Sequence, residues 1–472
     1  MSTAEYDNFL LHTEFAEHLY HRIASSLPII DYHSHIDPLM LVKNESFLDM
    51  SSLWIIPDPY KHRAMRMNGV PERICTGQAS DEERFTAWMD TLTNSIGNPL
   101  YHWSYLELKR YFEIDIYKGH IVIDTLRDKC NALLRHDSFL PRAILKRSNV
   151  EVLITSDDII SDPSDHIKIT EDESYSVYPS MRVDRLLNLG SGEDKVFLKE
   201  LSRVTGVKII HPKDFRDAIE TRIELFDKAG CTISDHALTQ FCFFPFSEVE
   251  FDNLLVKIIA DETLTKEDNI KYQSYLMQLL GRTYAKFEWT MMLHLGAVRN
   301  TSQRLKTLAG PFGGFATIGS SIQIEDIIRY LNELEKTNSL PKIILFNSNP
   351  SDNSMIATLS GSFTQDGVRG KVQFGPAWWY NDHELGIRNH ILIYASHALL
   401  NLYIGMTTDS RSLLSFVRHE YFRRILCDIL GAWYERGELS RDETAIEDLV
   451  KNICYRNPKN LVIHGRALNK NA

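Results

Sequence analysis

Short apolar runs alternate with longer stretches of helical periodicity along most of the chain. Each run has the length of a β-strand, and the runs cover residues 29–36, 150–156, 176–182, 232–237, 290–297, 342–346, 372–378 and 402–407. This alternation is typical of parallel strands that are joined by helices. Eight strands are the number that closes a barrel of βα units. The pattern therefore predicts an α/β fold, a distorted (β/α)8 TIM barrel.

An open, doubly wound sheet is the competing architecture for this pattern. That fold normally carries a glycine-rich phosphate loop directly after its first strand. Here the first apolar run leads instead into His33, Ser34 and His35, and ends before Pro38. The barrel is therefore the favoured prediction.

Two stretches between predicted strands are much longer than one connecting helix requires. They cover about residues 40–145 and 239–288. Segments with a helical pattern lie within them at 79–95, 103–111 and 272–287. Insertions that follow barrel strands lie on the catalytic face. Because no Pro/Gly/Ser-rich linker divides the chain, we expect residues 1–472 to form one barrel domain with helical insertions on that face.

Composition narrows the class of protein. The 472 residues are 43 % hydrophobic and 24 % charged, as in an ordinary globular protein. A net charge of −11 argues against nucleic-acid binding, because phosphate binding requires a cationic face. No run of about 18 apolar residues predicts a membrane span. The N-terminal region lacks a signal-peptide pattern and the six cysteines form no Cys-x-x-Cys pair, so we expect a reduced protein in the cytoplasm.

Candidate metal ligands lie at the ends of the first and last predicted strands. His33 and His35 are two residues apart, so in a strand both imidazoles point to the same side. Closure of a barrel makes its first and last strands neighbours, which would bring Asp409 beside them. Two imidazoles and a carboxylate make an open metal site. The simpler alternatives are two polar residues at a strand end and, for Asp409, a helix N-cap before residues 412–425.

Arginines and aromatic residues follow several of the predicted strands. Guanidinium groups bind carboxylates through two hydrogen bonds, so arginines beside a metal suggest an anionic, oxygen-rich substrate. Surface arginines in ion pairs are the alternative. A histidine in an apolar run is either a site residue or part of the core, and tandem tryptophans form either a substrate wall or barrel core. The residues concerned are Arg182, Arg299, Arg411, His294, Trp378 and Trp379.

Several longer motifs resemble one family, the uronate (glucuronate) isomerases of the amidohydrolase superfamily. The motifs are YKHRAMR at 60–66, GNPLYHW at 97–103, LHLGAVRN at 293–300, TDSRS at 408–412 and RHEYFRR at 418–424. The resemblance runs from about His33 to Asn457. One departure is that the family often reads Asp-His-Tyr-Lys-Trp where this chain has Asp58-Pro59-Tyr60-Lys61-His62. Either His62 replaces the missing histidine, or that histidine is dispensable here.

The resemblance implies an activity and a set of site residues. The family interconverts D-glucuronate with D-fructuronate, and D-galacturonate with D-tagaturonate, by proton transfer between C2 and C1 through a cis-enediol. By position, the metal ligands are His33, His35 and Asp409. The resemblance also places Tyr60, Arg182, Arg411 and Trp379 at catalytic or substrate positions. Together with the strand-end residues above, the expected catalytic residues are Asp409, Arg411 and Tyr60, and the expected substrate-binding residues are Arg182, His294, Arg299 and Trp379. The expected partners are a hexuronate substrate and a second copy of the chain in a homo-oligomer.

Two other functions remain as alternatives. The first alternative is a metal-dependent hydrolase. Hydrolases of the superfamily with two metals typically add a lysine after the fourth strand and a histidine after the sixth. This chain does not offer that full set of ligands, which favours a mononuclear site. A non-catalytic sugar-acid binding protein is usually exported. Imidazole and carboxylate ligands suit zinc, manganese, cobalt or nickel, and we take one divalent ion, zinc, as the expected cofactor.

Overall fold

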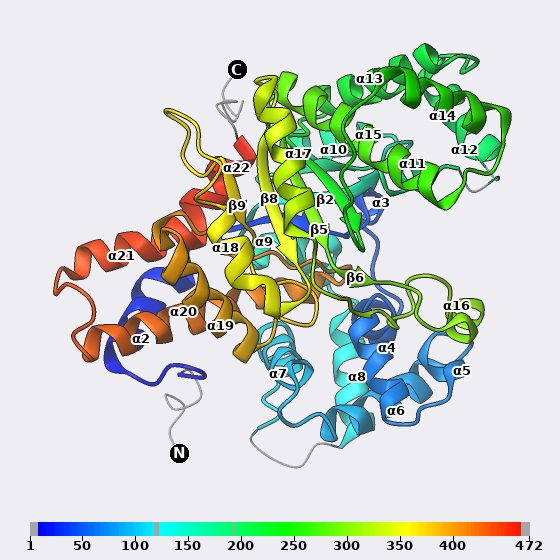
Figure 1. Ribbon diagram of the computed structural model, residues 1–472. Helices are drawn as coiled ribbons and strands as arrows, with labels where there is room; N and C mark the ends of the chain where they lie inside the picture. The colour runs from blue at the N-terminus through cyan, green and yellow to red at the C-terminus, as the bar shows by residue number, and fades with distance from the viewer. Residues whose placement is uncertain (1–7, 118–121, 191, 193, 464–472) are drawn as a thin grey trace.

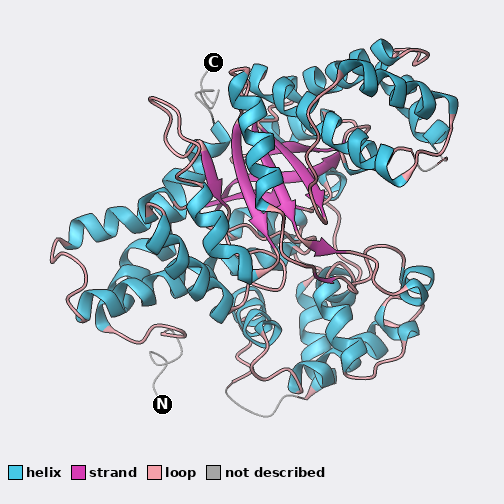
Figure 2. Cartoon of the chain, viewed as in Figure 1, coloured by secondary structure: helices cyan, strands magenta, loops and turns pink. Residues whose placement is uncertain are grey.

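Seven parallel strands form one curved sheet at the centre of the molecule, with helices packed around it (Figure 2). The computed structural model describes residues 8–117, 122–190, 192 and 194–463. The strands pair in chain order: β1 (Ile29–Ser34), β2 (Val150–Asp158), β3 (Ser176–Arg182), β4 (Ile233–Leu238), β5 (Thr290–Leu295), β8 (Lys342–Asn347) and β9 (Val372–Phe374). Sequential parallel pairing is the arrangement that winds a βα barrel. The predicted α/β barrel fold is confirmed, in a distorted form.

Helices connect the strands and cover the outer face of the sheet (Figure 1). Between β1 and β2 lie α3 (Pro38–Lys43), η3 (Ser51–Ile55), α4 (Pro59–Met67), α5 (Glu72–Cys75), α6 (Asp81–Thr93), α7 (Pro99–Phe112), α8 (Ile123–Leu133), η4 (Asp137–Phe139) and α9 (Pro141–Arg147). The later helices up to β5 are α10 (Ser164–Asp172), α11 (Asp184–Leu187), α12 (Asp194–Thr205), α13 (Pro212–Lys228), α14 (Glu248–Ala260) and α15 (Lys266–Lys286).

The remaining helices lie at the two ends of the chain and after β5. The N-terminal set is α2 (Glu14–His18), η1 (Leu19–Ile23) and η2 (Ala24–Ser26). The C-terminal set is α16 (Gln303–Ala309), α17 (Ile324–Lys336), η5 (Pro350–Asp352), α18 (Asn353–Leu359), α19 (Glu384–His397), η6 (Leu400–Leu402), η7 (Leu413–Phe416), α20 (Val417–Glu435), α21 (Glu443–Lys451), η8 (Asn452–Arg456) and α22 (Asn457–Ile463). Helix α2 packs on α20, which brings the N-terminal helices against a late segment of the chain.

Apolar side chains fill both sides of the sheet. The side that the sheet encloses holds a compact cluster that includes Ile30, Val152, Met292 and Ile344. A larger cluster fills the space between the sheet and the surrounding helices. Strands covered on both faces need near-continuous apolar sequence, and every residue of β1 is buried. This requirement explains why the strands stand out as apolar runs in the sequence.

The predicted eighth strand at 402–407 is wrong, because this segment follows η6 without forming a strand. Left-handed backbone at Gly405 and Asp409, with φ of 69° and 45°, prevents a continuous extended run. The barrel is closed locally instead. The backbone N–H of Asp409 donates to the carbonyl of His33 at 3.1 Å, and that of His35 to the carbonyl of Ser410 at 2.9 Å.

The side chain of Asp31 also holds this last segment against β1. Its carboxylate accepts from the backbone N–H and the hydroxyl of Thr408, at 2.9 and 2.5 Å. Asp31 is fully buried. Side-chain hydrogen bonds thus do here what a regular β-ladder does between the other strands.

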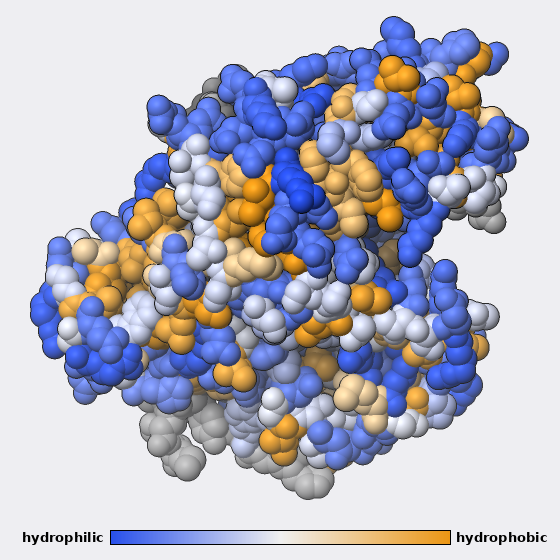
Figure 3. Space-filling view, in the orientation of Figure 1, coloured by the Kyte–Doolittle hydropathy of each residue, from blue (hydrophilic) through white to orange (hydrophobic). Residues whose placement is uncertain are grey.

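The long insertion between β1 and β2 lies beyond the carboxyl ends of the strands, in the lower right of Figure 1. Its residues 118–121 lie outside the described part of the chain. In the second long stretch, α15 packs on β5 and α17 as a connecting helix. Among the described helices none is long and apolar enough to cross a membrane. The face in Figure 3 intersperses hydrophilic and apolar residues.

A two-stranded hairpin that the sequence pattern did not predict follows β5. Strand β6 (Ala297–Val298) pairs antiparallel with β7 (Thr317–Ile318). The hairpin brackets residues 299–316, which we call the overlying segment. This segment covers part of the site described next.

Candidate functional site

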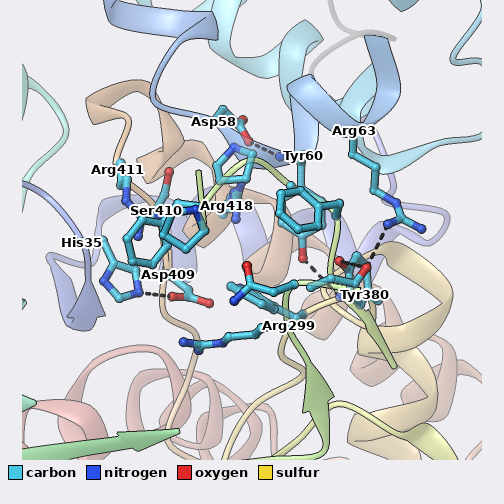
Figure 4. A pocket seen from close by; sticks show the side chains of 18 of the residues that line it. His35, Asp58, Tyr60, Arg63, Arg299, Tyr380, Asp409, Ser410, Arg411 and Arg418 are labelled. Atoms are coloured by element: carbon cyan, nitrogen blue, oxygen red, sulfur yellow. Dashed lines mark hydrogen bonds and ion pairs between the residues drawn. The ribbon is translucent and has the colours of Figure 1, made fainter. Parts of the chain in front are cut away.

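A pocket opens at the carboxyl ends of the strands, where barrel folds place their ligands. Figure 4 shows side chains from the loop after β1, from α4, from the overlying segment and from the segment before η7 converging on it. The pocket is partly open to solvent. Its lining comprises His35, Asp58, Pro59, Tyr60, Arg63, Arg182, Arg299, Asn300, Pro311, Phe312, Gly314, Phe315, Ala316, Trp379, Tyr380, Asp409, Ser410, Arg411 and Arg418.

His33, His35 and Asp409 meet at the floor of the pocket. Asp409 Oδ1 lies 3.2 Å from Nε2 of His33 and 2.9 Å from Nε2 of His35. The other carboxylate oxygen, Oδ2, accepts a hydrogen bond of 2.8 Å from the indole N–H of Trp378. The N-cap before η7 is Ser412, so Asp409 is not a helix cap.

These three side chains have the geometry of ligands to one divalent ion. Ligand atoms about 2.1 Å from a metal ion lie roughly 3 Å from each other. Asp409 Oδ1 is buried and faces the two imidazole nitrogens. A carboxylate oxygen and two imidazoles in this arrangement fit one divalent ion. Burial opposes ionisation of Asp409, but the two histidines hold its pKa well below the usual range. It is therefore a carboxylate at neutral pH.

The two imidazoles differ in their electrostatic surroundings. Burial lowers the pKa of His35 to about 4, although Asp409 opposes this shift. Burial also disfavours the charged form of His33, but Asp235 and Asp409 outweigh it and raise the pKa of His33. His35 is therefore neutral near pH 7, the form that binds a metal ion.

A second buried group lies behind the first. His294 Nδ1 is 3.0 Å from Asp235 Oδ1, and the His294 ring lies 4.7 Å from that of His33. Ser156 donates to Asp235 at 2.6 Å, and a guanidinium nitrogen of Arg182 lies 3.7 Å away. His33, Asp235 and His294 are close enough to offer a second set of ligand atoms. His294 is thus beneath the pocket and does not line it.

Among the described residues five arginines line the pocket, and three of them, Arg182, Arg299 and Arg411, are those predicted from the sequence. Arg182 binds Asp184 at 2.7 Å, with its guanidinium fixed between two carboxylates. Arg299 stacks over the ring of Trp379 at 5.1 Å. Arg411 lies over the ring of Phe312 at 5.2 Å. Within the described part of the chain Arg411 forms no ion pair within 4 Å, and its side chain lines the pocket (Figure 4).

Tyr60 belongs to a network at the wall of the pocket. Its hydroxyl donates to Asp382 at 3.1 Å and accepts from the backbone N–H of Tyr380, also at 3.1 Å. Arg418 lies 3.6 Å from Asp382 and donates to the carbonyl of Thr408 at 2.9 Å. Its guanidinium also stacks on Trp103 at 4.1 Å. Arg418 therefore joins the tyrosine network to the segment that carries Asp409.

The start of α4 accounts for the unusual Pro59. Asp58 caps the helix by accepting from the N–H of Tyr60 at 2.9 Å, and Pro59 occupies the first helical turn. Proline is favoured there because its fixed φ suits a helix and its missing N–H is not needed. His62, on the same helix, is buried and does not line the pocket. It does not stand in for the histidine that the family often has before the tyrosine.

The overlying segment is fastened to α4 and to Tyr380. Arg63 and Tyr380 both donate to the carbonyl of Ala316, at 3.0 and 2.8 Å. Gly314 has a φ of 76°, and a Cβ there would lie 2.1 Å from the carbonyl oxygen of Pro59. This close approach requires glycine at that position.

The structure brings most of the predicted site residues together. Lining the pocket are Tyr60, Arg182, Arg299, Trp379, Asp409, Arg411 and His35; His33 and His294 lie just beneath it. Sequence reasoning did not single out Asp235, Asp382 or Arg418, and left Trp378 between core and site. Arg418 belongs to a motif of the family resemblance, whereas Asp382 carried no signal in the sequence.

Comparisons with known proteins identify the family and the fold of the chain. A family model described as glucuronate isomerase matches residues 1–462. A uronate isomerase from Geobacillus thermodenitrificans is 41 % identical over 96 % of this chain and 97 % of its own length. The solved uronate isomerase from Thermotoga maritima is similar with a TM-score of 0.90 and 30 % identity, covering 98 % of this chain and 100 % of that one. A glucuronate isomerase from Caulobacter crescentus, at 22 % identity and a TM-score of 0.88 over 98 % and 97 % of the two chains, has the same fold.

Proposed function

The chain belongs to the glucuronate isomerase family, whose aldose–ketose isomerases interconvert D-glucuronate and D-fructuronate, and we propose that the pocket beside His35 and Asp409 is where it does so. The observation that carries this proposal is the meeting of Arg182, Arg299 and Arg411 with a buried His/His/Asp group in one pocket. D-Galacturonate and D-tagaturonate are the second substrate pair that we propose.

The charges of the pocket suit a sugar acid. A hexuronate carries a carboxylate at C6, and guanidinium groups bind carboxylates through paired hydrogen bonds. Arg182 is held by Asp184 at 2.7 Å, whereas Arg299 lies 3.6 Å from the same carboxylate. Arg299 and Arg411 line the pocket and are thus less engaged by carboxylates of the protein. We assign the C6 carboxylate to Arg299, supported by the wall of Trp379 against which a sugar chain packs. We assign Arg411 to the other end of the substrate, where C1 and C2 react.

The reaction moves one carbon-bound proton. The C2 proton of the open-chain aldose is acidic because C2 adjoins the C1 carbonyl, and its removal gives a cis-enediol in which negative charge develops on oxygen. We assign Asp409 as the base that takes this proton and returns it to C1, since it is ionised and fixed by Trp378. Arg411 stabilises the developing charge electrostatically. Tyr60 contacts the substrate oxygens.

His33, His35 and Asp409 would hold the divalent ion that we propose as cofactor, with zinc as the expected metal. When bound, such an ion polarises a carbonyl or hydroxyl oxygen that contacts it. Trp378 orients the carboxylate ligand through its indole N–H. Contacts of this kind around a metal ligand are the usual means of fixing its orientation.

Removal of the metal tests this assignment. We expect purified protein to form ketose from D-glucuronate, to lose at least about 90 % of its rate after chelation, and to recover with added zinc, because Lewis-acid catalysis is worth several kcal/mol. Ketose is measured by reduction coupled to a dehydrogenase, and metal content by mass spectrometry. Full activity in metal-free protein would refute the catalytic role of the ion. Absence of ketose from both uronates would favour the hydrolase alternative.

Gly314→Ala tests the role of the overlying segment. The new methyl group would collide with the carbonyl oxygen of Pro59. We expect KM for D-glucuronate to rise about 10-fold, because positive φ and displacement of the segment together cost roughly 1–2 kcal/mol. Gly310→Ala is the control, since Gly310 also has positive φ, at 71°, but no atom within 4 Å of the added Cβ. Equal KM values for the two variants would contradict the proposed contact.

The remaining proposals concern the protein as a whole. We propose a cytoplasmic homo-oligomer that binds no nucleic acid, supported by the net charge of −11 and by exposed apolar side chains such as Met67 and Ile96, at 77 and 79 % exposure. Sedimentation analysis at several protein concentrations measures the oligomeric state. A single species of 54.5 kDa at all concentrations would exclude the oligomer.

A further inference from the structure

We infer that Tyr60 and Asp382 act as one relay for the oxygen-bound proton of the reaction, with Asp382 as the positioning residue behind the tyrosine. This inference rests on the proposed function, because it assigns to these residues the transfer of a proton between the substrate's O2 and O1. It adds a residue that does not line the pocket and therefore touches no substrate atom.

The hydrogen bonds of Tyr60 leave one place for a substrate hydroxyl. A phenolic oxygen has one proton to donate and two acceptor sites. The proton of Tyr60 is directed at Asp382, whose oxygens lie 3.1 and 3.3 Å away, and one acceptor site is taken by the N–H of Tyr380. The remaining acceptor site is free for an incoming hydroxyl. When a proton arrives there, the proton that Tyr60 already carries can pass to Asp382.

Asp382 is equipped to hold a proton for a short time. Its side chain is buried, with 8 % exposure, and the groups that face it are Tyr60 on α4, Arg418 and Tyr421 on α20, Tyr380 beside it and, at longer range, Asp409. Burial raises the pKa of Asp382 to about 6, although Arg418 opposes the shift. A carboxylate of this basicity is ionised at pH 7 and still able to accept a proton.

Tyr60 by itself is poorly suited to losing a proton. Burial, with Asp382 as the next contribution, raises the pKa of Tyr60 well above its usual value of 10. A free phenolate is therefore disfavoured in this wall of the pocket. Tyr60 must therefore accept the substrate's proton at the same time as it gives its phenolic proton to Asp382. The tyrosine then stays neutral throughout.

The proton balance of the isomerisation is met without any co-reactant. After C2 loses its proton, O1 carries the negative charge and O2 still carries a proton. O2–H gives its proton to Tyr60 Oη while Tyr60 gives its own to Asp382. The two transfers then reverse toward O1, which becomes the C1 hydroxyl, while O2 becomes the ketose carbonyl and C1 is protonated. Tyr60 and Asp382 end as they began, and no oxidant or reductant is consumed.

A double-mutant cycle on the metal-loaded enzyme tests the relay. We expect Tyr60→Phe and Asp382→Asn each to lower kcat about 100-fold with KM within about threefold, because loss of a general acid–base group costs about 10²–10⁴ in rate. The double variant should be no slower than the slower single variant, since either change breaks the same relay. A kcat of Asp382→Asn within threefold of wild type, or a double variant slower by the product of the single effects, would overturn the inference.

The pH dependence of kcat/KM distinguishes a proton relay from a purely structural role of these residues. Because Asp382 must be ionised at the start, kcat/KM of the wild type should fall as pH drops through about 6. This fall should be absent in both Asp382→Asn and Tyr60→Phe, and an unchanged fall in either variant overturns the relay. Tyr60→Phe leaves the pair of Asp382 and Arg418 intact, so the test survives if Asp382→Asn fails to fold.

Asp428→Asn is the matched control. Asp428 is also buried and bound by an arginine, Arg388, at 2.7 Å, but it takes no part in the pocket. Its loss should lower the melting temperature without lowering kcat. Wild-type protein assayed in parallel separates the two hypotheses, because an inactive wild type refutes the proposed function whereas an active wild type with unaffected variants refutes only the relay.

Discussion

Asp409→Asn is expected to lower kcat/KM for D-glucuronate by about 10³-fold or more. Asparagine has the same size as aspartate but no charge and little basicity, so the change removes both the proposed base and the anionic partner of His33 and His35. Loss of a general base alone costs about 10²–10⁴ in rate. Because metal affinity falls with the same substitution, the two losses add in one assay of ketose formation.

The backbone at this position makes the substitution a clean test. Asp409 has a φ of 45°, in the left-handed region, and asparagine is among the few residues that adopt it readily. The amide oxygen can still accept from Trp378. We therefore expect the melting temperature of the apo protein to change by only a few degrees while activity is lost.

Asp261→Asn is the control for Asp409→Asn. Asp261 also has positive φ, at 70°, and ends α14 outside the pocket. Its replacement should leave kcat and metal content unchanged. If Asp409→Asn retained a rate within tenfold of wild type, Asp409 would not be the base, and the carbon-bound proton would need another acceptor.

The second large effect is expected on stability. Arg182→Met removes the cation that lies 3.7 Å from the buried carboxylate of Asp235. Burial works against the ionised form of Asp235, and Arg182 contributes most to keeping the pKa of Asp235 well below its usual value. Removal of one partner from a buried ion pair costs about 3–5 kcal/mol, because the other charge stays buried without compensation. We expect the free energy of unfolding to fall by about 3 kcal/mol, since His294 and Ser156 still contact Asp235.

Denaturant unfolding followed by circular dichroism measures this difference. The matched control is Arg329→Met, in which an exposed arginine pairs with Asp326 three residues earlier. An exposed pair of this kind contributes about 0–1 kcal/mol. Equal losses in the two variants would show that Asp235 does not depend on Arg182. Activity of Arg182→Met, assayed well below the unfolding transition, separately tests the role of Arg182 in substrate binding.

The strands could be predicted from the sequence where burial requires apolar residues. Seven predicted runs correspond to strands, because a parallel strand covered on both faces is rich in apolar residues even where polar ones such as Asp31 and Asp235 interrupt it. The run at 402–407 is equally apolar and equally buried, yet it forms no strand. Its conformation depends on Asp31 and on the left-handed residues that end it, and apolar composition carries no information on either.

Site residues could be predicted from the sequence where strand geometry fixes the direction of their side chains. Two residues apart on one strand, His33 and His35 must share a side, and barrel topology brings Asp409 to them. Asp382 and Arg418 escaped notice because their relation to Tyr60 spans more than 300 residues of sequence. Neither the hydrophobic periodicity nor the spacing of motifs indicates a contact between residues so far apart in the sequence.

The alternation of apolar runs and helical stretches is enough to indicate the class of fold, and strand geometry is enough to place His33 and His35 together as candidate metal ligands. Tertiary structure alone decided how the barrel is closed, which arginines remain free for a substrate, and which carboxylate stands behind Tyr60. Each of these depends on desolvation and on distances between distant segments. Burial is what turns an ordinary aspartate such as Asp382 into a group that titrates at about pH 6, and burial exists only in the folded chain.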